Sequence, residues 1–281
     1  MKLLVLDGNS IINRAFYGIK LLSTKNGDYT NAVYGFLNML KRFEDMCSPD
    51  AVTVAFDVHA PTFRHKKYDL YKAGRHAMPD ELRQQMPVVK NILHLLGIKT
   101  IECEGWEADD VLGTLAKSCR DNGNECYIAT GDRDSLQLAH DGVKVLLART
   151  KSTDVCDEKT IMEEYGVTPH QLIQVKALQG DSSDNIPGVA GIGPKTAIDL
   201  ISKYGTLDYI YDNLDSLEIK PGVKAKLEKD KGNAYLSLDL GEIRTNAPID
   251  TDINSYVVTG GDKQAAAREF ARLELYSLLD K

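Results

Sequence analysis

Acidic side chains gather at five separate places along the chain, a grouping typical of enzymes that bind divalent cations. Three carboxylates occur within 107–110 at the start of an expected helix, and pairs occur within 132–134 and 181–184. Two single aspartates follow apolar runs. Each group alone has an ordinary explanation, because acids complement a helix N-terminus and aspartate is common in turns. The candidate metal ligands are Asp7, Asp57, Glu107, Asp109, Asp110, Asp132, Asp134, Asp181 and Asp184.

Nine carboxylates brought to one place repel one another unless cations lie between them. The acidic segments contain neither histidine nor cysteine, and ligands that are all oxygen favour Mg²⁺ or Mn²⁺ over softer metals. Two such ions about 3.5–4 Å apart can activate a water and stabilise the leaving oxygen of a phosphodiester. The pattern therefore predicts two or more divalent cations and hydrolysis of a phosphate ester.

An alternation of strands and helices must position these acids in the first half of the chain. Apolar runs predict strands at 3–6, 51–56, 99–102, 125–130 and 143–147. Helical spacing predicts helices over 31–43, 78–96 with a kink or break at Pro87, and 107–119. The alternation predicts an α/β fold with a mainly parallel central sheet and helices on both faces. Ligands bind beyond the carboxyl ends of such strands, where Asp7, Asp57 and Asp132 fall.

The pattern becomes wholly helical after about residue 157. A helix is expected from 168 to 178, a glycine-rich hairpin over 186–195, and a second helix over 196–204. A last helix follows Gly260 and Gly261, with apolar positions at Phe270, Leu273, Leu278 and Leu279. We therefore expect two domains, an α/β domain over 1–160 that carries the acids and a helical domain over 161–281 packed on the first.

Composition excludes several classes of protein. The 281 residues are 43% hydrophobic and 27% charged, and no apolar run is long enough to cross a membrane. The N-terminus does not have the pattern of a signal peptide. Five cysteines without a CxxC pair suggest neither a disulfide framework nor a zinc site, so a reducing, cytoplasmic setting is expected.

The net charge of −7 argues superficially against a nucleic acid partner, but the distribution of charge matters more than the sum. Between 59 and 76 the chain carries five basic residues and a single acid, Asp69. Tyrosines interleave with these cations, as in surfaces that stack unpaired bases and hold phosphates. A solvated amphipathic helix has the same composition and remains an alternative.

Residues 188–196, GVAGIGPKT, fit the turn of a helix–hairpin–helix. Glycines let a backbone approach a phosphate closely, and the following helix offers free N–H groups and the positive end of its dipole. Such a contact positions duplex DNA without reading bases. An ordinary glycine turn is the alternative.

These segments together resemble the 5′ nuclease (flap endonuclease) family, and within it the N-terminal 5′→3′ exonuclease domain of bacterial DNA polymerase I. The resemblance runs along nearly the whole chain. Its motifs are LDGNSIINRAFYG, FDVHAPTFRHKKYDLYKAGRHAMPDEL, GWEADDVLGTLA, ATGDRDSLQL, GDSSDNIPGVAGIGPKTA and REFARLELYSLL. It implies a PIN-like 5′ nuclease fold, and a divalent-metal-dependent 5′→3′ exonuclease and flap endonuclease that serves DNA replication and repair.

The resemblance also implies roles for particular residues. Five acids match the ligands around a first ion, namely Asp7, Asp57, Glu107, Asp109 and Asp110. Four match those that reach a second, namely Asp132, Asp134, Asp181 and Asp184. Lys72 and Arg75 match basic residues that contact the scissile phosphate from an arch over the active site. The remaining DNA-binding candidates are Arg14, Tyr71, Gly191, Gly193, Lys195 and Thr196.

The expected partners are DNA with 5′ flaps, nicks or branched ends, and RNA-primed DNA. The family hairpin also binds a monovalent cation, K⁺, through backbone carbonyls. We expect a monomer near the bacterial nucleoid, either free-standing or covalently part of a DNA polymerase I. Three alternatives compete: a non-catalytic binder of branched DNA, a ribonuclease of the related PIN group, and a haloacid-dehalogenase-type phosphatase. The last requires a nucleophilic aspartate at position 5, where this chain has Val5.

Overall fold

A computed structural model describes residues 1–149 and 152–279. Its centre is a six-stranded sheet in the order β3-β2-β1-β4-β5-β6. The strands are β1 (Lys2–Asp7), β2 (Ala51–Phe56), β3 (Lys99–Glu102), β4 (Glu125–Thr130), β5 (Val143–Ala148) and β6 (Thr153–Cys156). The first five pair in parallel, which confirms the predicted sheet. Every residue of β2 is buried, as expected for a strand covered on both faces.

The sixth strand was not predicted. β6 pairs antiparallel with β5 and is only four residues long. It lies at the edge of the sheet, where Val155 is 46% exposed. Its burial is therefore too slight to leave an apolar run in the sequence.

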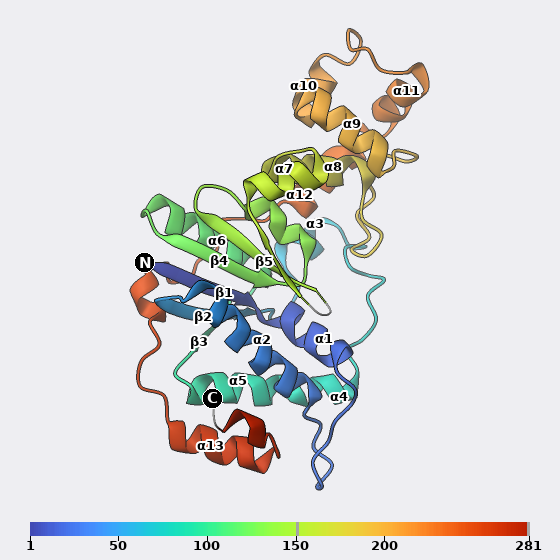
Figure 1. The fold of residues 1–281 in the computed structure, drawn as a ribbon. Coiled ribbons are helices and arrows are strands. Elements are labelled where there is room, and N and C mark those ends of the chain that lie inside the picture. The colour runs from blue at the N-terminus through green and yellow to red at the C-terminus, as the bar shows by residue number, and fades with distance from the viewer. Residues whose placement is uncertain (150–151, 280–281) are drawn as a thin grey trace.

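Helices cover both faces of the sheet, as Figure 1 shows. On one face α1 (Gly8–Gly18), α2 (Asn31–Cys47), α5 (Gln85–Leu95) and α13 (Lys263–Arg272) share a core around Phe36, Phe43 and Phe56. On the other face α6 (Ala108–Asp121) and η2 (Ile253–Tyr256) share a second core. Within the described residues, no helix is long and apolar enough to cross a membrane.

A helical unit stands above the β5 side of the sheet in Figure 1. It contains α7 (Glu158–Tyr165), α8 (Pro169–Gln179), α9 (Pro194–Tyr204), α10 (Leu207–Asp212), α11 (Pro221–Lys229) and α12 (Lys231–Gly241). The unit has its own core, and α8 packs against η1 (Arg133–Leu138). Residues after α12 return to the sheet, where Phe270 and Leu273 join the first core. We therefore propose that the helical domain ends near α12 instead of at residue 281.

Two helix boundaries differ from the predicted ones. The expected break at Pro87 occurs earlier, at Gln84 between α4 (Asp80–Arg83) and α5. Pro87 lies in the first turn of α5. Backbone N–H groups in that turn have no acceptor within the helix, so a proline there costs no hydrogen bond. The last helix ends at Arg272, because Glu274 adopts a left-handed conformation with φ of 57°, and Tyr276–Leu278 form a separate turn, η3.

Candidate metal centre

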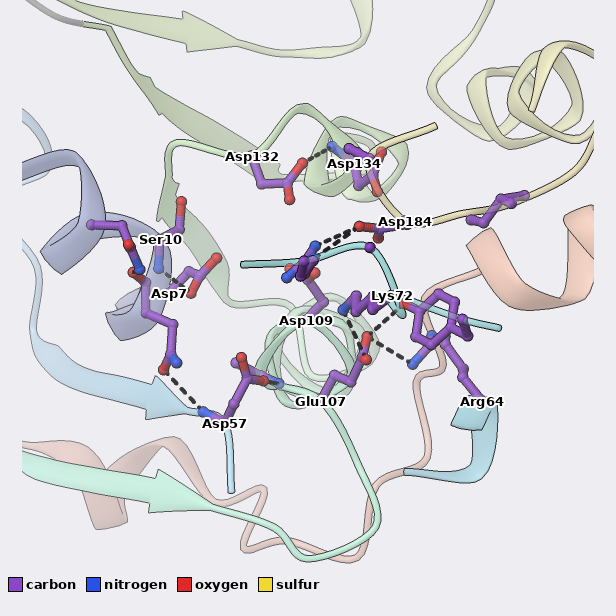
Figure 2. A pocket seen from close by; sticks show the side chains of 18 of the residues that line it. Asp7, Ser10, Asp57, Arg64, Lys72, Glu107, Asp109, Asp132, Asp134 and Asp184 are labelled. Atoms are coloured by element: carbon purple, nitrogen blue, oxygen red, sulfur yellow. Dashed lines mark hydrogen bonds and ion pairs between the residues drawn. The ribbon is translucent and has the colours of Figure 1, made fainter. Parts of the chain in front are cut away.

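The carboxyl edge of the sheet forms one wall of a cavity of about 580 Å³. Acids reach it from three strand ends, from the N-terminus of α6 and from the loop that follows α8. Figure 2 shows these side chains pointing toward a common space. The cavity is lined by Asp7, Asp57, Glu107, Asp109, Asp132, Asp134 and Asp184. Seven of the nine predicted acids therefore line one cavity, although they come from segments far apart in the sequence.

Backbone and hydroxyl donors fix the carboxylates at the strand ends. Asp7 caps α1, where its Oδ1 accepts from the Ser10 N–H at 2.9 Å, and its Oδ2 accepts from the Thr130 hydroxyl at 3.0 Å. Asp57 accepts from the Ala108 N–H at 2.7 Å. These bonds hold the acids in place before any ligand arrives, which is the preorganisation that a metal centre requires.

Crowding and burial raise the pKa values of several of these carboxyls. Burial, with the nearby Asp57, raises the pKa of Asp7 to about 7. Burial, with the neighbouring charges of Asp7 and Asp132, raises the pKa of Asp109 well above its ordinary value. Burial raises the pKa of Asp134 to about 6. Carboxylates whose charges repel one another in this way suit a site for divalent cations, because a bound cation favours the charged form of every carboxyl.

The raised pKa values predict how stability depends on pH in a chelator. The pKa of Asp7 is about 7 in the folded protein and about 3.8 ordinarily. Between these values the unfolded chain loses its proton first, so the contribution of Asp7 to stability falls as pH rises from 4 to 7. Asp7→Asn removes this loss, so its melting temperature in EDTA should exceed that of the wild type more at pH 7.5 than at pH 5. Scanning calorimetry at both pH values measures this difference. A difference that is constant or shrinks with pH contradicts the assignment.

A second acidic group lies beside the first. One carboxylate oxygen from each of Asp134, Asp181 and Asp184 lies within 4.8 Å of the others. Lys176 Nζ lies 2.5 Å from Asp134 and 2.8 Å from Asp181. Although burial acts to raise the pKa of Asp181, hydrogen bonds from Lys176 and Ser183 lower it to about 2. The Lys176 ammonium thus supplies positive charge at this group.

Lys176 was missed by the reasoning from sequence. It is buried on α8 among apolar neighbours, and a lysine at such a position seldom lacks a charged partner. That signal could have identified it as a site residue, although not its partners.

Asp110 stands apart from most of the other predicted ligands, and its role as a ligand stays a prediction. Its side chain is fully buried and does not line the cavity. Both oxygens accept from the Arg64 guanidinium, at 2.7 and 2.8 Å, and from the N–H groups of Glu107 and Arg244. In this structure Asp110 therefore pairs with Arg64 and leaves no oxygen directed at the cavity.

The basic stretch crosses over the acids between α3 (Phe63–Lys67) and α4. Lys72 Nζ lies 2.8 Å from Glu107 Oε1, and Arg75 Nη2 lies 2.5 Å from Asp184 Oδ1. The Lys72 N–H also donates to the carbonyl of Asp184 at 2.9 Å. Lys72 and Arg75 therefore reach the same cavity as the predicted metal ligands.

Tyr71 does not have the exposed ring that base stacking requires. It is 4% exposed, and its hydroxyl donates to Glu107 Oε2 at 3.1 Å. Its ring packs with Ile186 and Leu240 and lies edge-on to His65. In this structure Tyr71 supports Glu107, and its role as a DNA contact stays a prediction.

The hairpin residues lie outside the metal cavity. Gly191 has a φ of 76°, and its carbonyl accepts from Lys226 Nζ at 2.9 Å. Gly193 precedes α9, whose first residues are Pro194, Lys195 and Thr196, and the Lys195 side chain is exposed. Arg14 lies apart from the hairpin, where its Nη2 donates to the carbonyl of Gly131 at 3.3 Å.

Comparison with known families gives two matches that together cover most of the chain. Residues 2–166 match a family described as "5'-3' exonuclease, N-terminal resolvase-like domain". Residues 167–264 match one described as "5'-3' exonuclease, C-terminal SAM fold". The boundary between the matches falls within the helical part of the fold, between α7 and α8.

Similar proteins and structures agree with these matches. The chain is 40% identical over 282 residues to DNA polymerase I of Bacillus subtilis, covering 100% of this chain and 32% of that protein. It is 41% identical over 280 residues to the thermostable DNA polymerase I of Thermus filiformis, covering 99% and 33%. The chain thus spans about a third of the length of these relatives.

Two solved structures share the fold. The T5 D15 protein co-crystallized with metal ions has a TM-score of 0.74 and 21% identity, covering 87% of this chain and 90% of that one. The catalytic core of Rad2 in complex with DNA substrate has a TM-score of 0.62 and 19% identity, covering 97% and 86%. The matched sequence families, the relatives and the acidic cavity of the sheet lead to one conclusion: the chain belongs to the 5′–3′ exonuclease family.

Proposed function

We propose that this 5′ nuclease hydrolyses DNA phosphodiesters at 5′ flaps, nicks and branched ends, including RNA-primed ends, with Mg²⁺ or Mn²⁺ as its cofactor. The observation that carries the proposal is the convergence of seven carboxylates in one cavity beside Lys72 and Arg75. Hard cations and a phosphate are the ligands that such a combination of acids and bases fits.

The acids divide into two groups that would each hold a cation. Asp7, Asp57, Glu107 and Asp109 form the first group, and Asp132, Asp134, Asp181 and Asp184 form the second. Bound cations supply positive charge at the phosphate and lower the pKa of water. Because Asp110 pairs with Arg64, we propose that it supports the first group through Glu107 instead of binding directly.

Lys72 and Arg75 have two sets of partners in this proposal. In this structure they pair with Glu107 and Asp184. When cations satisfy those carboxylates, the ammonium and guanidinium groups become available to a phosphate. A charged donor next to the scissile group stabilises the charge that develops during hydrolysis.

The helical unit positions the duplex in our proposal. Lys195 and the exposed N-terminus of α9 bind backbone phosphates, which carry no sequence information. K⁺ bound to hairpin carbonyls would add charge at the same place, and Lys226 already donates to one of them. We propose a monomer, since all the elements used here come from one chain, and we propose that it serves within a protein of the DNA polymerase I type.

A panel of substrates tests this function. A labelled 5′ flap, a nicked duplex and a single strand of one sequence are incubated with Mg²⁺, with Mn²⁺ and with EDTA. The flap and the nicked duplex should be cut faster than the single strand, with either metal, and EDTA should abolish cleavage. Tight binding without cleavage in any metal supports the alternative, a non-catalytic binder of branched DNA. Cleavage in EDTA contradicts the metal dependence.

A further inference from the structure

A second cavity, of about 610 Å³, adjoins the metal cavity. It lies between α1 and α2, near the residue that follows β5. Ser10, Asn13 and Tyr17 on α1 line both cavities, so the two spaces share a wall. A molecule that occupies one is therefore a direct neighbour of a molecule that occupies the other.

The second cavity is basic where the first is acidic. Arg14, Arg42 and Arg149 line it, and no acidic residue does so in the part of the chain that the structure describes. Arg149 pairs with Asp154 at 2.7 Å. Among the described residues, Arg14 and Arg42 have no carboxylate within 4.0 Å.

Both of these arginines have a buried nitrogen without a hydrogen-bond partner. The Nε atoms of Arg14 and Arg42 are buried and donate to nothing that the structure describes. The remaining contacts of these side chains are neutral, since Arg42 donates to the Thr153 hydroxyl at 2.6 Å and Arg14 to a carbonyl. A buried donor of a charged group is unfavourable without a partner, and an anionic ligand would relieve that cost.

The rest of the lining suits a nucleoside. Ala15, Gly35 and Met39 form apolar wall, and the ring of Tyr17 is 71% exposed at the boundary between the two cavities. An apolar wall with an aromatic ring at its mouth and charge on one side matches a base attached to a phosphate.

We propose that the cavity between α1 and α2 binds one nucleotide of DNA, with its phosphate on Arg14 and Arg42 and its base beside Met39 and Tyr17. This rests on the proposed function, because the adjoining metal cavity supplies the reason for DNA to be there. The phosphate has two possible sources. It belongs either to a strand of the bound substrate or to the 5′-mononucleotide that hydrolysis releases.

Methyl NMR of the full chain reports on the two cavities separately. Met39 lines the second cavity and Met78 lines the first, whereas Met46 is exposed elsewhere on α2. The protein labelled with ¹³C at its methionine methyls is titrated in EDTA with a flapped duplex, and separately with dAMP. The Met39 resonance should shift while that of Met46 stays. A shift with dAMP identifies the released nucleotide as the ligand, and a shift with the duplex alone identifies a strand phosphate.

Two arginine variants and a matched lysine variant complete the test. Arg42→Ala should reduce the affinity for the probe that shifts Met39, dAMP or the flapped duplex, roughly threefold or more. For the duplex it should also lower the salt slope of binding by about one. Arg42→Lys should restore part of the affinity. Lys41→Ala removes the same charge from the adjacent position of α2, where Lys41 pairs with Asp45 outside the cavity, and should change neither quantity.

The outcomes separate this proposal from the proposed function. A Met39 resonance that stays unmoved with saturating duplex and with dAMP overturns the nucleotide site, whatever the cleavage assay gives. Equal losses in Arg42→Ala and Lys41→Ala overturn it too, because general charge attraction then explains the binding. A Met39 shift in a protein that cuts no substrate with any metal instead overturns the proposed function.

Discussion

Asp109→Asn should slow cleavage of a 5′ flap roughly 10³-fold or more while leaving DNA binding nearly intact. Asp109 lies at the first turn of α6, and the charges of both Asp7 and Asp132 act on it. An amide at this position keeps the size of the side chain but removes one negative charge from the acidic cavity that would hold the cations. Binding should survive because our proposal assigns the phosphate contacts to Lys72, Arg75 and the hairpin. Single-turnover cleavage in Mg²⁺ and fluorescence anisotropy in EDTA measure the two effects.

Two comparisons show whether the loss is chemical. Asp121→Asn removes one acid from the far end of the same helix, where Asp121 pairs with Lys117, and should cut at the wild-type rate. Asp109→Asn should melt no lower than the wild type in EDTA, because it relieves repulsion among buried acids. Wild-type cleavage by Asp109→Asn, and by Asp132→Asn at the neighbouring ligand, would mean that the active site lies elsewhere.

Lys72→Ala should slow single-turnover cleavage by roughly 10²-fold with only a modest loss of affinity. The Lys72 ammonium lies 2.8 Å from Glu107, so it faces the cavity in which the phosphate would react. A cation there acts on charge that develops in the transition state, and its loss falls mainly on kcat. The single-turnover rate and the affinity are measured across a salt series.

Two other lysines provide the contrast for Lys72. Lys195→Ala should weaken binding of flap and plain duplex alike and lower the salt slope by about one, because a remote phosphate contact acts equally on ground and transition states. Lys66→Ala removes an exposed charge from the same basic stretch and should have little effect on either quantity. If Lys72→Ala only weakens binding, or Lys195→Ala only slows the chemical step, the division of roles is wrong.

The position of the site was predictable because it depends on strand ends. An apolar run that stops at an aspartate fixes both the strand and the edge of the sheet at which the carboxylate lies. Parallel pairing of β1 with β2 and β4 then brings Asp7, Asp57 and Asp132 together. This part of the argument requires local sequence and one rule of topology.

The contacts that could not be predicted from the sequence depend on partners from distant segments. Asp110 belongs to the same motif as Asp109, yet it pairs with Arg64, which lies 46 residues away in the chain. Lys176 meets Asp134 across 42 residues. Neither pairing leaves a periodic or compositional trace, because it depends on how α3 and α8 pack against the sheet. The burial of the Tyr71 ring was missed because aromatic composition alone does not distinguish a buried ring from an exposed one.

The Arg64 side chain has a consequence for how the molecule folds. Its Nε donates to the carbonyl of Leu240 at 2.8 Å and its Nη2 to that of Glu242 at 2.7 Å, while the rest of the guanidinium holds Asp110 and reaches Glu107. One buried group thus joins three segments of the chain. If one of these segments opened alone, Arg64 or Asp110 would stay buried without a partner for its charge. We therefore expect α3, the start of α6 and the end of α12 to open together as a single cooperative unit, or foldon, that joins the sheet to the helical unit.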